Sequence, residues 1–335
     1  MMPLLTVILP ANAGIFFAQI MHITAFEVFD TKPYLDSYLR LEPADPVNAN
    51  FEAVGLESIY FPQNLGTLLL AFVFYLVMVI LSKLLLLCSE DEVKVNLYSP
   101  CPSFNECGKI LHRNLFWGSL INLVTEAYSM MTLSCMINLK YLRWDSFSLI
   151  FMSSLSILVT LVLLAYPAFF AWELTKDFDS LETWHMRKKY GKWYEDLDLR
   201  NGKMVLLQPI WFLVRRFIMS VMVVFLSTTV IWQIALMTLT IIVQVIILGR
   251  IQPYSVSGKR WFEMVSETIL MMILYHFICF TPFVPDLEVR FNLGYSVCGL
   301  VCIPLALSLF LLLQENYRDA KMKYLVHQAG KAHDA

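Results

Sequence analysis

Ionisable residues inside long apolar stretches of the sequence are candidates for function, and we single out Glu126, Arg215, Arg216, Glu267 and His276. An ionisable group in apolar surroundings is costly unless it is paired, neutralised or hydrogen-bonded, so such residues mark ion pairs, proton paths or cation sites. We expect one of the two arginines to pair with Glu267, because all three lie at similar depth in their apolar stretches. Such a pair is either a clamp that fixes helix register or a switch in an ion path.

Glu126 lies near the middle of its apolar stretch. If it faces other helices, we expect it to be protonated or to hydrogen-bond Gln233, Gln244 or Tyr128. His276 has aromatic neighbours on both sides, which is more typical of a packing residue with satisfied hydrogen bonds than of a ligand. A proton or cation site that uses Glu126 and His276 is the alternative.

The amino-acid composition indicates whether the segments that carry these residues lie in water or in a membrane. Hydrophobic residues make up 58% of the 335 residues and charged residues only 16%, whereas soluble domains are about 25% charged. The sequence therefore predicts an all-α polytopic membrane protein with the lipid bilayer as its surroundings. The net charge is -2, and no basic tract with interleaved aromatic residues is present, so nucleic acid is not an expected partner.

Apolar stretches of roughly 20 residues are long enough to cross a bilayer as helices. We expect about seven such spans, at residues 65–86, 115–138, 147–171, 209–228, 231–249, 263–283 and 292–314. The fourth and fifth are separated only by Ser227, Thr228 and Thr229. These two helices must form a tight hairpin or be short and tilted.

Residues 1–30 are apolar, but they have neither a basic start nor a small-residue cleavage site, so a cleaved signal peptide is not expected. From Asn12 onwards the polar residues gather on one side of a helix, which predicts a helix lying in the membrane interface. An eighth span is the alternative.

Lysine and arginine gather in residues 174–203, 250–262 and the C-terminal tail, and basic loops stay on the cytoplasmic side. The N-terminus is therefore expected outside and the C-terminus in the cytoplasm. We assign residues 1–61 to an interfacial helix and an extracellular segment, 62–314 to a seven-helix bundle with a cytoplasmic linker at 174–203, and 315–335 to a cytoplasmic tail. In the linker, Trp184, Trp193 and Tyr194 fit interfacial anchoring.

Several motifs carry a resemblance to a known family. They are LPANAG at 9–14, NLGTLL at 64–69, YGKWYEDLDLRNG at 190–202, RRF at 215–217, QPY at 252–254, SETILMMILYHFICFTPFVPD at 266–286 and RFNLGY at 290–295. Together they resemble the C-terminal membrane module of large ciliate cysteine-rich surface proteins. The resemblance implies a plasma or ciliary membrane location. Because the chain has no cysteine-rich repeats, we expect a short member or the membrane part of something longer.

A distant similarity to TRP-like or polycystin-like channel regions can be tested by length. Such a channel needs roughly 20 or more residues for a pore helix and filter between its last two spans. Only VPDLEVRF lies between Phe283 and Asn292, and we expect Asp286, Glu288 and Arg290 to form a hydrated turn there. This spacing argues against a filter at that position.

Neither cysteines nor enzyme motifs define a reactive site. Cys298 and Cys302 share a helix face without completing a metal site, and Cys101 and Cys107 are expected to be reduced in the cytoplasm. No phosphate loop, GxSxG or HExxH is present, so we expect no enzyme, cofactor or metal.

Two functions therefore remain open. One is a non-enzymatic anchor or receptor-like module whose partner binds within 1–61, and the other is an ion channel or transporter subunit.

Overall fold

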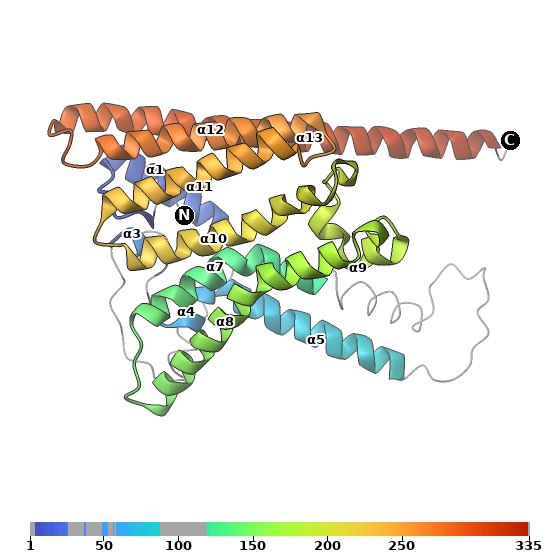
Figure 1. The fold of residues 1–335 in the computed structure, drawn as a ribbon, viewed down its shortest axis with the longest axis horizontal. Helices are drawn as coiled ribbons and strands as arrows, with labels where there is room; N and C mark the ends of the chain where they lie inside the picture. The colour runs from blue at the N-terminus through green and yellow to red at the C-terminus, as the bar shows by residue number, and fades with distance from the viewer. Residues whose placement is uncertain are drawn as a thin grey trace. The chain divides into compact units, whose positions relative to one another are not determined.

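The chain folds into helices, as a computed structural model shows for residues 4–25, 37, 49–52, 56, 58–87 and 119–333 (Figure 1). The longer helices are α1 (Ala11–Ala25), α5 (Thr67–Leu87), α7 (Leu120–Lys140), α8 (Phe147–Lys176), α9 (Trp184–Tyr194), α10 (Leu207–Phe225), α11 (Val230–Ile251), α12 (Ser257–Cys279) and α13 (Leu287–His333). Short helical segments are α3 (Ala49–Glu52), α4 (Phe61–Leu65), η3 (Phe178–Ser180), η4 (Leu199–Asn201) and η5 (Lys203–Leu206).

Among the described residues, six helices are long and apolar enough to cross a membrane: α7, α8, η5 with α10, α11, α12 and α13 as far as Arg318. The first expected span, 65–86, is the 21-residue apolar helix α5, which is not among these six. The prediction of an all-α polytopic membrane protein is confirmed.

The fourth and fifth expected spans are two separate helices, and the break between them includes Ser227, Thr228 and Thr229. Helix α10 ends at Phe225 and α11 begins at Val230. Lys140, at the end of α7, donates from Nζ to the Val224 carbonyl at 2.8 Å and to Ser227 Oγ at 2.7 Å. A cation on the last carbonyls of a helix satisfies acceptors that have no partner within the helix.

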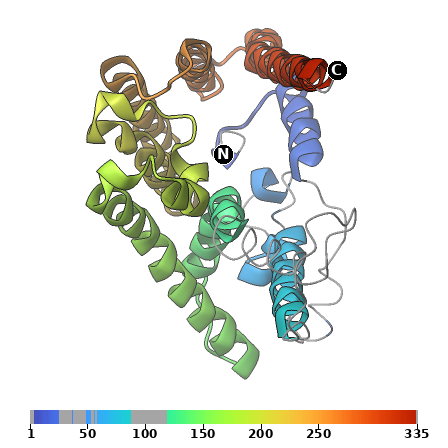
Figure 2. The same cartoon turned by 90° about the vertical axis from the view of Figure 1, so that its right-hand side faces the viewer.

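The chain divides into two compact units, each described here by itself. The first comprises Met1–Thr6 and Phe17–Met237, and the second comprises Val7–Phe16 and Thr238–Ala335. In the first unit, α7 packs against α8, α10 and α4, and α8 packs against α10. Figure 2 shows α7 between α8 and the short helix α4.

In the second unit α12 packs against α13, and residues 280–286 join them. This connection leaves no room for a pore helix and filter. Asp286 caps α13, because its Oδ1 accepts the Glu288 backbone N–H at 2.9 Å. The expected hydrated turn is therefore wrong in part, since Glu288 and Arg290 already lie in the first turns of α13.

The first and the last long helix correspond to the expected interfacial helix and to the expected last span with its tail. The expected interfacial helix is α1, although its place in a membrane interface stays a prediction. Helix α13 continues through the expected tail to His333, so the last span and the tail form one helix.

Candidate functional site

The spanning helix α8 contains a proline within its length. Pro167 has no backbone N–H, so the Leu163 carbonyl four residues earlier in α8 loses its usual helical donor. The buried Tyr128 hydroxyl of α7 donates to that carbonyl at 2.9 Å. A neighbouring helix thus satisfies the backbone group that the proline frees, as spanning helices require.

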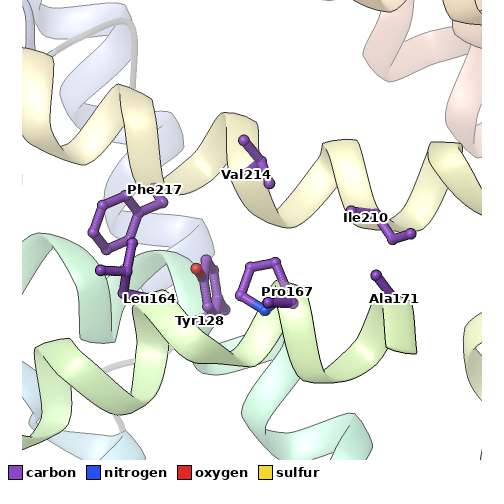
Figure 3. Close-up of a pocket in the computed structure, with 8 residues that line it drawn as sticks. Tyr128, Leu164, Pro167, Ala171, Ile210, Val214 and Phe217 are labelled. Atoms are coloured by element: carbon purple, nitrogen blue, oxygen red, sulfur yellow. The ribbon is translucent and has the colours of Figure 1, made fainter. Parts of the chain in front are cut away.

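Beside this contact lies a cavity of about 290 Å³, which we call the Pro167 cavity. Helices α7, α8 and α10 line it with Tyr128, Leu164, Pro167, Ala168, Ala171, Ile210, Val214 and Phe217. Figure 3 shows the α8 side chains facing those of α10 across the gap. The lining is apolar apart from the Tyr128 hydroxyl, which already donates to Leu163.

Next to the cavity, the linker helix α9 docks onto the bundle through aromatic side chains. The aromatic cluster comprises Tyr166 and Phe170 of α8 with Tyr190 and Trp193 of α9. The Trp193 ring centroid lies 3.7 Å from that of Phe170 and 5.5 Å from that of Tyr190, with the latter pair stacked. Ring contacts of this kind add to the energy of apolar burial.

A threonine of α7 joins the cluster by hydrogen bonds. Thr125 Oγ1 donates to the Ile121 carbonyl at 2.8 Å, so it accepts from Trp193 Nε1 at 3.3 Å and from the Tyr166 hydroxyl at 3.2 Å. Trp193 is only 8% exposed, and Tyr194 is buried too. The expectation that both anchor in the membrane interface is wrong, because they pack on protein instead; Trp184, at 71% exposed, is accessible enough for that role.

Two phenols of α9 are held in their neutral form. The Tyr190 hydroxyl donates to Glu173 Oε1 at 2.8 Å, and the Tyr194 hydroxyl donates to the Leu181 carbonyl at 2.8 Å. Burial raises the pKa of Tyr190, and its bond to Glu173 raises it further. Burial also raises the pKa of Tyr194 to about 12, against an opposing effect of Arg187. Both groups therefore remain hydrogen-bond donors at neutral pH.

Polar groups between the spanning helices bond directly to one another. Thr132 Oγ1 of α7 and Ser220 Oγ of α10 lie 2.9 Å apart and are buried. Ser156 of α8 donates to the Cys135 carbonyl of α7 at 3.2 Å. These contacts cross the α7–α10 and α7–α8 interfaces without an intervening group.

Glu126 is exposed, so it does not meet the condition under which we expected a bundle partner for it. The Tyr128 hydroxyl is engaged by Leu163, and Gln233 accepts from Thr6. Glu126 does interact electrostatically with half-buried Arg216, whose guanidinium lies 3.9 Å from the Phe212 ring centroid.

The other expected pair spans the two units. Arg215 belongs to the first unit and Glu267, 7% exposed, to the second, so their pairing stays a prediction.

Within the second unit, His276 joins α12 to α13. Its Nδ1 lies 2.8 Å from the Met272 carbonyl, which can only accept, so Nε2 accepts from Ser296 Oγ at 3.1 Å in the neutral ring.

The described cysteines Cys135, Cys279, Cys298 and Cys302 are free thiols. Within the part of the chain that the structure describes, no three His, Cys, Asp or Glu side chains gather as a metal site would require. Cys101 and Cys107 lie outside the described residues.

Sequence reasoning missed the Tyr128–Pro167 arrangement and the aromatic cluster. The available signal was a proline inside an apolar run, because such a proline frees a carbonyl that a neighbouring helix, a side chain or water can satisfy.

Comparison with protein-family models, with curated proteins and with solved structures finds no match. The fold and its apolar helices define an integral, polytopic α-helical membrane protein. Its resemblance to the ciliate surface-protein module stays a prediction from the motifs.

Proposed function

We propose that the chain is a non-enzymatic membrane module that tethers an extracellular assembly or partner to the plasma or ciliary membrane. The N-terminus lies outside and the C-terminus in the cytoplasm, as the basic loops predict. The ciliate-like motifs support the location.

The observation that carries the proposal is the direct bonding between spanning helices. Thr132 reaches Ser220, Ser156 reaches Cys135, and Tyr128 reaches Leu163. A water-filled route needs polar side chains that face water, whereas these face protein. These polar groups between α7, α8 and α10 are therefore engaged by protein, which supports a structural role for the three helices.

Contacts at the C-terminal end of α7, which is remote from the linker, support the proposal that a partner binds on that side of the bundle. Asn138 donates to the Ile59 carbonyl at 3.1 Å, and the residues of α4 are buried there. Thr6 donates to Gln233 Oε1 from its hydroxyl at 3.0 Å. N-terminal residues therefore pack on the side of the bundle that we expect to lie outside. Most of the 30–61 segment, our expected partner region, lies outside the described residues.

A second candidate is a channel or transporter subunit, which the Glu126–Arg216 interaction favours. Charged residues in spanning helices often belong to ion or proton paths. A route along this exposed face would need further chains to enclose it.

Ion flux distinguishes the two candidates. Purified protein is reconstituted into liposomes that contain a potassium- or proton-sensitive dye. We expect the ion leak of liposomes with the protein to equal that of protein-free liposomes. The Glu126→Gln variant should give the same leak. A larger flux that Glu126→Gln alters would favour the transport function.

Tethering is tested separately on cells with a membrane-impermeant cross-linker. We expect cross-linked complexes with an extracellular partner, lost when residues 30–48 are deleted although the protein still reaches the membrane. Complexes that survive the deletion, or that form only from the cytoplasmic side, would contradict the proposal.

A further inference from the structure

The Pro167 cavity is the right chemical surface for hydrocarbon. Its eight lining residues come from three spanning helices, and its one hydroxyl is already bonded to Leu163. The only polar atom that the lining offers to water is the Tyr128 hydroxyl oxygen, and apolar cavities of about 150 Å³ in proteins bind benzene rather than water. At about 290 Å³ the cavity is larger and is able to take a longer hydrocarbon segment.

Small residues give the cavity its space on the α8 side. Ala168 and Ala171 both line the cavity, and Ala171 lies on the same side of α8 as Pro167 and faces Ile210 of α10 (Figure 3). Two of the lining residues, Leu164 and Ala168, are exposed in this chain. Acyl chains surround a helix that spans a membrane, so they contact an open apolar cavity on it such as the Pro167 cavity.

The depth of the cavity matches the upper part of an acyl chain. Ala171 is followed at once by Trp172, which is 70% exposed, and exposed tryptophans of spanning helices lie at the headgroup level. On α10, Ile210 is near the start of the helix, directly after η5. One end of the cavity therefore opens near the membrane surface at the linker.

Positive charge stands at that end. Lys176 ends α8, and Lys203 begins η5, which packs on α8 and α10. Both lysines are exposed, and Lys203 Nζ lies 5.9 Å from the ring centroid of Phe178, just beyond α8. Basic side chains beside a spanning helix attract anionic headgroups.

We propose that the Pro167 cavity binds one acyl chain of an anionic phospholipid from the linker-side leaflet, with the headgroup at Lys176 and Lys203. The site is independent of the tethering function.

The test uses the full-length protein in nanodiscs of phosphatidylcholine that contain a small fraction of phosphatidylglycerol with a photoreactive acyl chain. Labelled residues are located by mass spectrometry. We expect labels on the cavity residues of α8 and α10, reduced by excess unlabelled phosphatidylglycerol but not by excess phosphatidylcholine.

Ala168→Phe should lower cavity labelling by about tenfold or more, because the ring displaces several methylene groups. The matched control is Ala165→Phe, on the same exposed helix but outside the lining, which should leave labelling unchanged. Lys203→Gln should lower the preference for the anionic lipid by about fivefold, and Lys192→Gln in α9 should not.

Three results would overturn the proposal. Labelling spread evenly over exposed α8 residues would show an ordinary lipid boundary, and equal competition by phosphatidylcholine would remove the headgroup claim. Cross-links from Ala168→Cys to a second copy of the chain would assign the Pro167 cavity to a helix–helix interface. If Ala168→Phe does not fold, the lipid competition on the wild-type protein decides the matter.

Discussion

The bond between Tyr128 and the Leu163 carbonyl should matter only because α8 contains Pro167. Tyr128→Phe removes the donor and leaves the carbonyl unsatisfied in an apolar interior. Leaving a buried acceptor without a partner costs roughly 1–3 kcal/mol, whereas interhelical bonds in membranes average only about 0.6 kcal/mol. The freed carbonyl has no helical donor to return to, so we expect a loss of about 1–2 kcal/mol.

Pro167→Ala provides the matched background. The substituted alanine would supply the missing N–H within α8, so Tyr128→Phe should then cost about 0.5 kcal/mol or less. The assay is reversible unfolding in mixed micelles, measured for both single variants and the double variant. Tyr275→Phe, at an exposed tyrosine of α12, is a control that should leave the free energy of unfolding unchanged. An equal cost of Tyr128→Phe in both backgrounds would refute the reasoning.

Three further predictions concern the docked linker and the helix interfaces. Trp193→Ala should detach α9 and cost about 3–5 kcal/mol, seen as faster limited proteolysis of the linker, whereas Trp184→Ala should change the rate little; equal rates would contradict the docking. Thr132→Val with Ser220→Ala should show a coupling of about 0.6 kcal/mol, because each hydroxyl also has a carbonyl of its own helix, and zero coupling would indicate hydration. Burial raises the pKa of Tyr194 to about 12, so its contribution to stability is complete below the unfolded value of about 10 and is lost as the pH rises through about 12; an absorbance titration complete near pH 10 would contradict this.

The sequence predicted the spanning helices well because their signal is local. Length and apolarity alone identify α8 or α12, and the three polar residues before Val230 are enough to separate α10 from α11. The short connection after α12 was also readable from spacing, although the exact start of α13 depended on the capping carboxylate of Asp286.

The site could not be read in the same way. Tyr128 and Pro167 are far apart in sequence, and the contact depends on how α7 packs on α8. Trp193 and Tyr194 are of the residue types that anchor helices in the membrane interface, but tertiary packing buries them. Glu126 stood out by residue type, yet its exposure is set by the face that α7 presents, which a run of apolar neighbours does not determine.

The most direct test of a packed, non-conducting core is water access at Thr132, which lies fully buried between α7 and α10. Thr132→Cys is made in a background where the native cysteines are replaced, and membranes are treated with a small, charged thiol reagent. Trp184→Cys, exposed in the linker, serves as the positive control. We predict no labelling of Thr132→Cys from either side of the membrane. Rapid labelling of that thiol in folded protein would reveal a hydrated path and contradict the anchor function.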